Sequence, residues 1–131
     1  MQTFLPYPDF QRTAAILDSR RLGKQRIEAK HILSVLHDGG YWEFHPAVRM
    51  WRGYEEALAL YMDTMIIEWV RRGYNNTMLL AATSANAPRP LWLGNTAFHI
   101  SHQSNLIRKD PAYYRPIFPG ILASLPYVWP A

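Results

Sequence analysis

Helical periodicity is the feature that most constrains this chain, because four stretches show apolar residues at helical spacing and none shows convincing strand alternation. The first covers residues 9–17, where Asp9 suits the N-cap and Pro8 prevents backward extension. The second follows Asp18 and continues to about Leu36, before the sequence HDGG. Its apolar positions share one face: Leu22, Ala29, Ile32, Leu33 and Leu36. These patterns predict two successive helices near the N-terminus.

Two further stretches complete the predicted architecture. The third opens at Pro46, which suits a first helical position, and continues through Gly53 to about Arg72 as a short helix and then a long one. The fourth runs from about Thr96 to Arg108, and the proline- and aromatic-rich segment after it is expected to be irregular. We therefore predict an all-α fold, a helical bundle with an irregular C-terminal segment, forming one domain over residues 1–131.

Composition narrows the possible classes of protein. Hydrophobic residues make up 49% of the 131 positions, which is enough for a packed core. The absence of cysteine excludes disulfides, thiolate nucleophiles and cysteine-ligated zinc. The N-terminal segment lacks a secretory pattern, and no apolar run approaches the roughly 18 residues that span a bilayer. We therefore expect a cytoplasmic protein with no membrane association.

Cations gather on the second predicted helix, and the net charge of +4 indicates an anionic partner only where charge clusters in this way. One acid, Glu28, accompanies five basic residues there: Arg20, Arg21, Lys24, Arg26 and Lys30. Four later residues extend the predicted patch: Arg71, Arg72, Arg108 and Lys109. Two interpretations remain open. In the first, the cations form a solvated helix face with stabilising charge pairs. In the second, they bind the phosphates of duplex DNA.

Glu28 is the candidate catalytic residue of this cluster. As a structural residue it would pair with Lys24 or Arg21. As a catalyst it would stay ionised in the surrounding positive field, which suits stabilisation of a cationic intermediate better than donation of a proton. Residue type alone leaves both roles open.

Aromatic residues and histidines offer further candidates. The C-terminal segment contains Tyr113, Tyr114, Phe118, Tyr127 and Trp129. Such rings either close a small core or stack on DNA bases, and we expect at least half of them to belong to the core. His99 and His102 have the spacing of two metal ligands, but no third ligand lies in register, so we predict no metal site.

A resemblance to a known family rests on three blocks in order. They are RLGKQRIEA at residues 21–29, HPAVRMWRGYEEALALYMDTMIIEWVRRGYN at 45–75 and NTAFHISHQSNLIRKDPAYYRP at 95–116. Through them the chain resembles the pyrimidine-dimer DNA glycosylases of the phage endonuclease V type. The resemblance implies a DNA repair glycosylase with abasic-site lyase activity on damaged or modified pyrimidines. It also implies duplex DNA as partner, no cofactor and action as a monomer.

Site residues follow from the resemblance position by position. Glu28 falls on the family's catalytic carboxylate, which stabilises an imine at C1′ of the sugar. Arg21, Lys24 and Arg26 fall in the phosphate-contacting helix, and the pair Tyr113 and Tyr114 falls in the aromatic segment that meets DNA. The residue before the glutamate differs from the family pattern, because Ile27 stands where the family has arginine.

The nucleophile of the family is an N-terminal α-amine, which is partly neutral at pH 7 because its ordinary pKa is about 8. In the family this amine belongs to a threonine exposed by methionine removal, whereas this chain reads Met1-Gln2-Thr3. Three alternatives stay open: Met1 supplies the amine, trimming exposes Thr3, or no imine forms. A non-catalytic DNA-binding module and an enzyme acting on modified nucleotides are the competing functions.

Overall fold

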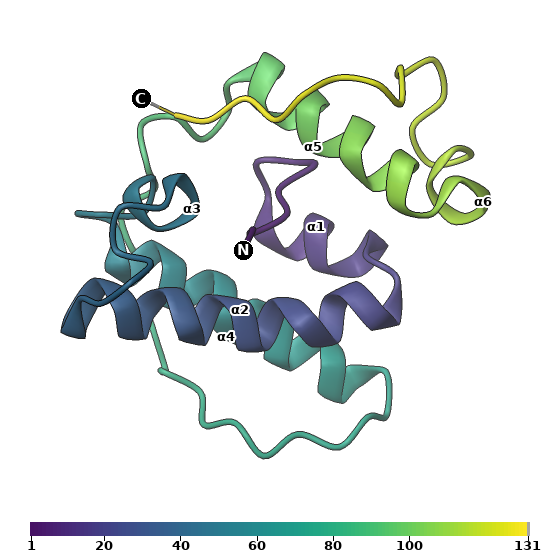
Figure 1. Cartoon of the computed structure of the whole chain (residues 1–131). Coiled ribbons are helices and arrows are strands. Elements are labelled where there is room, and N and C mark those ends of the chain that lie inside the picture. Colours follow the sequence, from purple (N-terminus) through teal and green to yellow (C-terminus); the bar gives the residue numbers. More distant parts are fainter. Residues whose placement is uncertain (131) are drawn as a thin grey trace.

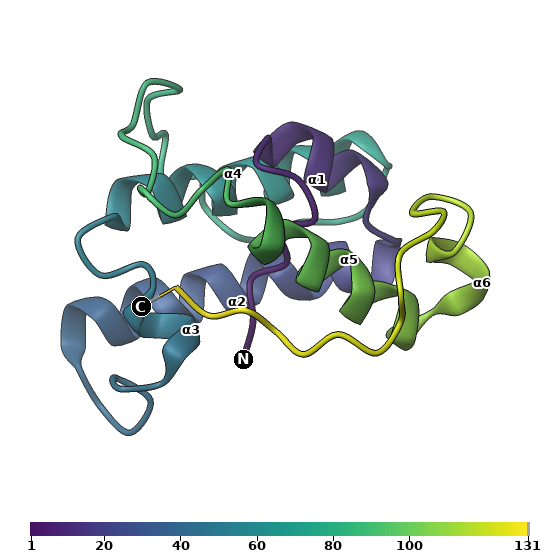
Figure 2. The ribbon, with the colours of Figure 1, turned by 90° about the horizontal axis from the view of Figure 1, so that it is seen from above.

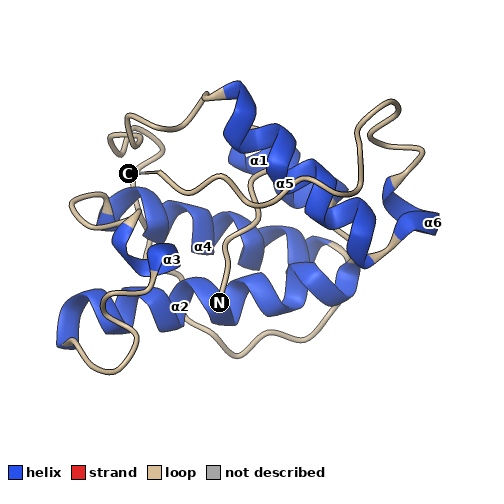
Figure 3. Cartoon of the chain, turned by 45° about the horizontal axis from the view of Figure 1, so that its top comes forward, coloured by secondary structure: helices blue, strands red, loops and turns tan. Residues whose placement is uncertain are grey.

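The protein is all-helical over residues 1–130, which the computed structural model describes, and no strand is present in that part of the chain (Figures 1 and 3). Ala131, the last residue of the predicted domain, lies outside the described residues. The helices are α1 (Phe10–Ile16), α2 (Ser19–Asp38), α3 (Pro46–Arg49), α4 (Glu55–Arg71), α5 (Thr96–Lys109) and α6 (Pro111–Tyr114). The predicted all-α class is confirmed. No helix between residues 1 and 130 combines the length and hydropathy needed to span a bilayer.

Local capping explains why the helix boundaries fall close to the predicted ones. Asp9 accepts a hydrogen bond from the backbone of Arg12 and so starts α1, and Asp18 caps α2 in the same way. Gly39 ends α2 with a positive φ of 75°, a conformation that glycine adopts without strain. The C-terminal segment differs from the prediction in one place. There α6 forms because Pro111 takes the first helical position and Asp110 caps it.

Helices α2 and α4 pack side by side in opposite directions and form one layer of the structure (Figure 1). Their facing side chains are fully buried, among them Leu22, Ala29 and Ile32 from α2 and Leu58, Tyr61 and Met65 from α4. Gly23 permits the close approach of the helices, because a Cβ atom there would lie 2.8 Å from the ring of Trp69. This layer therefore holds the charged face of α2 in a fixed orientation.

Helix α5 and the two chain ends form the second layer. Residues 1–6 run between α2 and α5, and the C-terminal segment runs back along α5 (Figure 2). The backbone N–H groups of Leu125 and Val128 donate to the hydroxyls of Ser104 and Ser101, at 3.0 and 3.1 Å. The N-terminus is thus enclosed between helices that lie far apart in the sequence.

Candidate functional site

Side chains rather than a sheet satisfy the backbone of the N-terminal segment. Gln25 of α2 accepts from the Phe4 N–H at 2.9 Å, and its amide donates to the Gln2 carbonyl at 3.0 Å. The hydroxyl of Tyr61 lies 2.7 Å from the Phe4 carbonyl oxygen and 2.6 Å from Gln25 Oε1. Burial is the main reason that the pKa of Tyr61 is raised. These bonds fix residues 2–4 against α2 and α4.

Two histidines of α5 hold the next residue of the same segment. His102 Nδ1 accepts from the Leu5 N–H at 2.9 Å, so this nitrogen carries no proton. His99 Nε2 accepts from the Gly94 N–H, and its Nδ1 therefore donates to the Leu5 carbonyl at 2.7 Å. Burial, followed by the nearby His99, lowers the pKa of His102 to about 3, which keeps the ring neutral. The two histidines thus position the chain. Within residues 1–130, no group of three or more histidine, aspartate or glutamate side chains could hold a metal ion.

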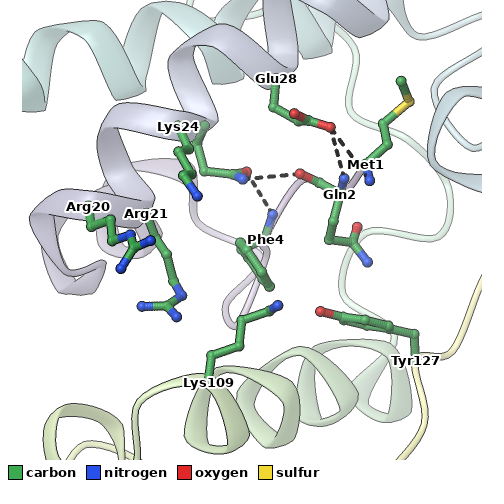
Figure 4. A pocket seen from close by; sticks show the side chains of 10 residues that line it. Met1, Gln2, Phe4, Arg20, Arg21, Lys24, Glu28, Lys109 and Tyr127 are labelled. Carbon is green, nitrogen blue, oxygen red and sulfur yellow. Dashed lines mark hydrogen bonds and ion pairs between the residues drawn. The ribbon is translucent and has the colours of Figure 1, made fainter.

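The α-amine of Met1 lies beside the carboxylate of Glu28. The amine nitrogen is 3.8 Å from Glu28 Oε1, and the Gln2 N–H donates to the same oxygen at 3.2 Å (Figure 4). The Glu28 side chain is 27% exposed, so the carboxylate is reachable from outside. The structure therefore brings together Met1 and Glu28, two of the three predicted catalytic residues.

Thr3, the third predicted catalytic residue, is enclosed in the core. Its side chain is fully buried, and its hydroxyl accepts from Trp51 Nε1 at 3.0 Å. Its backbone N–H donates to the side-chain oxygen of Gln2 at 2.9 Å. With Met1 and Gln2 in place, Thr3 therefore has a structural role.

An open cavity of about 420 Å³ surrounds the amine and Glu28. Arg20, Arg21 and Lys24 line it from α2, and Lys109 lines it from the end of α5 (Figure 4). Arg21 is ion-paired with Asp18 at 3.2 Å. Among the described residues, the other three cations have no ion-pair partner: Arg20, Lys24 and Lys109. We call these three the site cations. They leave the cavity with a net positive charge that suits an anionic ligand.

The remaining predicted DNA-binding cations lie elsewhere or are occupied. Arg26 packs 4.4 Å from the ring of Trp69 and donates to Asn76, and burial lowers its pKa. Arg108 donates to backbone carbonyls of the C-terminal segment. Arg71 and Arg72 bond to Glu68 on their own helix. Lys30 lies two residues beyond Glu28 and is exposed, but it does not line the cavity around the amine.

The two predicted aromatic contacts have different environments. Tyr114 is fully buried, and its hydroxyl accepts from the Asp18 N–H at 2.9 Å and donates to the Asp18 carboxylate. Burial is the first cause of its raised pKa. Its ring has no surface to offer to DNA in this structure. Tyr113 is 39% exposed, although its hydroxyl donates to the Ile16 carbonyl.

Sequence reasoning missed the residues that position the amine. Gln25 is 3% exposed and lies on the buried face of α2, between Leu22 and Ala29. A polar residue at an apolar position of the helical repeat was the signal that could have identified it. Tyr127, one of the aromatic residues noted in the C-terminal segment, lines the same cavity, but no pattern in that irregular segment related it to the N-terminus.

Comparison with known families adds one finding. A family model described as pyrimidine dimer DNA glycosylase matches residues 1–82, a stretch that contains the N-terminal segment and Glu28. Neither the search of curated proteins nor the search of solved structures found a match.

Proposed function

Because the chain belongs to the pyrimidine dimer DNA glycosylase family, we propose that it excises damaged or modified pyrimidines from duplex DNA with Met1 and Glu28 as its catalytic residues. The observation that supports this most is the Met1 amine, 3.8 Å from Glu28 Oε1 in a cavity lined by cations. Cleavage of the resulting abasic site and action as a monomer belong to the same proposal.

The proposed chemistry begins with a neutral α-amine attacking C1′ of the damaged nucleotide. The C1′–N bond breaks, and the base leaves with the bonding electrons. The attacking nitrogen loses a proton, its lone pair then expels O4′ from C1′, O4′ takes up that proton as a hydroxyl, and a cationic imine forms. Glu28 stabilises that cation because its carboxylate lies beside the nitrogen. Loss of a C2′ proton then expels the 3′ phosphate and nicks the strand.

Met1, and not Thr3, is the proposed nucleophile because Gln2 makes two hydrogen bonds that hold the N-terminal segment in place. The Gln2 N–H donates to Glu28 and the Gln2 carbonyl accepts from Gln25. Trimming to Thr3 would remove both bonds. The proposal therefore requires a free amine on Met1, and intact-protein mass spectrometry is its first check.

The site cations are the proposed phosphate contacts. Arg20 and Lys24 lie one helical turn apart on α2, and Lys109 faces them from α5 (Figure 4). Like charges placed together are unfavourable unless an anion binds between them, and a DNA backbone supplies phosphates at high density.

Borohydride trapping tests the proposal directly. Untagged protein is incubated with abasic-site duplex DNA and reductant, and the adduct is mapped by mass spectrometry. We expect wild type to give an adduct on the Met1 amine. Glu28→Gln should reduce its rate by about 100-fold or more and leave DNA binding intact, because only stabilisation of the cationic imine is lost.

Glu56→Gln is the matched control. It removes the same charge from an exposed position in the first turn of α4 and should trap at the wild-type rate. An adduct mapped to Thr3 would show that Thr3, and not Met1, is the nucleophile. Tight DNA binding by wild type with no adduct would refute the imine chemistry and favour a DNA-binding module.

A further inference from the structure

Three large aromatic side chains are exposed on one short connection between α2 and α3. Tyr41 is 90% exposed, Phe44 is 75% exposed and Trp42 is 43% exposed. We call residues 41–44 the aromatic loop. Figure 2 shows the α2–α3 connection projecting from the body of the molecule. Rings of this size are normally buried, and a cluster of exposed rings usually marks a binding surface.

The aromatic loop has a defined shape, so its exposure is not the result of a loose chain. The Glu43 N–H donates to the Gly40 carbonyl at 3.2 Å, and the His45 N–H donates to the Trp42 carbonyl at 2.9 Å. Arg52 donates to the Glu43 carbonyl at 3.2 Å. Gly40 takes a φ of 127°, which a residue with a side chain rarely adopts. The loop therefore holds its rings in a preorganised, exposed arrangement before any ligand binds.

The end of the loop is linked to the candidate site. His45, which follows it, is half-buried, and burial followed by the positive charge of the N-terminal amine lowers its pKa while Glu28 raises it. Ring contacts give the geometric link: the rings of His45 and Trp129 lie 6.0 Å apart, and Trp129 lies 5.7 Å from Tyr127, which lines the cavity around the amine. From Glu28 to the end of α2 at Asp38, the helix rises by about 15 Å. One strand of DNA rises about 3.4 Å per nucleotide, so this length corresponds to about four nucleotides, and a loop at that end of α2 can meet bases that flank the lesion.

Positive charge accompanies the rings. Arg49 and Arg52 are exposed, and neither has an ion-pair partner within residues 1–130. The one acid of the loop, Glu43, is half-buried. Aromatic rings beside unpaired arginines are the combination that binds unstacked nucleotides, because the rings stack on bases and the arginines attract phosphates.

We propose that the aromatic loop inserts among the bases that flank a damaged nucleotide, within a few nucleotides of it, and keeps the duplex open while the Met1 amine reaches the sugar. The rings concerned are chiefly Tyr41 and Phe44, the two most exposed. This inference rests on the proposed function, since it has the aromatic loop contact the bases around the same lesion on which the Met1 amine acts. It explains how a small protein compensates for the loss of stacking when a nucleotide leaves the helix.

A comparison of two duplexes tests the loop without depending on catalysis. They are identical except that one carries a tetrahydrofuran abasic-site analogue, which cannot form an imine. Wild type should prefer the analogue duplex. The double variant Tyr41→Ala/Phe44→Ala should lose that preference by roughly tenfold or more, with the affinity for intact duplex changed less than about twofold. Its melting temperature should match wild type because both rings are exposed.

Leu79→Ala is the matched control. This side chain is 88% exposed but belongs to the connection between α4 and α5, which runs on the other side of α2 and α4 from the N-terminus (Figure 1). It should keep the preference. An unchanged preference in the double variant, or an equal loss of affinity for both duplexes, would overturn the loop proposal. A change in the molar mass of the free double variant with unchanged DNA preference would identify a contact between copies instead.

Trapping by wild type on natural abasic-site DNA separates this inference from the proposed function. If wild type forms the adduct and the double variant keeps its preference, the loop proposal is wrong and the proposed function stands. If wild type forms no adduct but the double variant loses its preference, base stacking is supported and the imine chemistry is wrong.

Discussion

Two groups of basic residues look alike in the sequence and differ in the structure. The site cations Arg20, Lys24 and Lys109 line the cavity around the Met1 amine and have no ion-pair partner within residues 1–130. Arg71 and Arg72, at the end of α4, both bond to Glu68 at 2.7 to 2.8 Å. Hydrogen bonds from Arg71 and then Arg72 lower the pKa of Glu68 to about 2, against the opposing effect of burial.

The difference follows from where acids lie on each helix. Glu68 precedes Arg71 by three residues and Arg72 by four, which is the spacing at which helical side chains meet. Glu28 follows Lys24 by four residues, but its Oε1 faces the Met1 amine and the Gln2 N–H. A cation is free to bind a ligand only where the nearest acid is occupied elsewhere.

The largest expected effect comes from removing two site cations together. Arg20→Ala/Lys24→Ala should lower the slope of log affinity against log salt by about two, because each phosphate contact contributes roughly 0.9. Folding stability should not fall, since two like charges one helical turn apart are removed. Fluorescence anisotropy on duplex DNA over a range of salt concentrations measures the slope. An unchanged slope would mean that these cations do not contact phosphate.

Arg72→Ala should affect stability instead of binding. Its guanidinium donates to Glu68 and Ser19 and to the carbonyls of Ala14 and Ala15, so it ties the end of α4 to α1 and α2. Its side chain is 16% exposed. Loss of these bonds should cost about 2–4 kcal/mol of unfolding free energy, measured by urea denaturation. A decrease of about one in the DNA salt slope would contradict this structural assignment.

Local signals in the sequence were sufficient to predict the all-α class and the starts of the first two helices. Asp9 and Asp18 were identified as residues that begin helices, and both cap one, because the atoms involved lie within three residues of each other. The exception, α6, is a single turn whose proline start was interpreted as irregular chain. Of the residues predicted from the second helix, Glu28 lines the cavity around the amine together with Arg20, Arg21 and Lys24, whereas Arg26 and Lys30 do not; their roles stay predictions.

Long-range partners limited the prediction of the site. The partners of Arg72 at Ala14 and Ala15 lie 58 and 57 residues away. The hydroxyl of Tyr114 bonds to Asp18, 96 residues earlier in the chain. Tyr114 was predicted to contact DNA, but its ring is buried in the core. No periodic pattern within α4 or the C-terminal segment encodes these pairings, because tertiary packing decides them.

Arg71→Ala is the smallest expected effect and the most informative control for the comparison. Its side chain is 69% exposed and fully charged, as a DNA-binding cation would be, yet two of its nitrogens bond to Glu68. Exposed pairs contribute little to stability, so the melting temperature should shift by less than about 2 °C. The DNA salt slope should also stay at the wild-type value, because Arg71 must leave Glu68 before it can reach a phosphate. If the slope falls by about one, then pairing with an acid does not prevent a cation from binding DNA. Distance from the Met1 amine would then be the better criterion for identifying the cations that bind DNA.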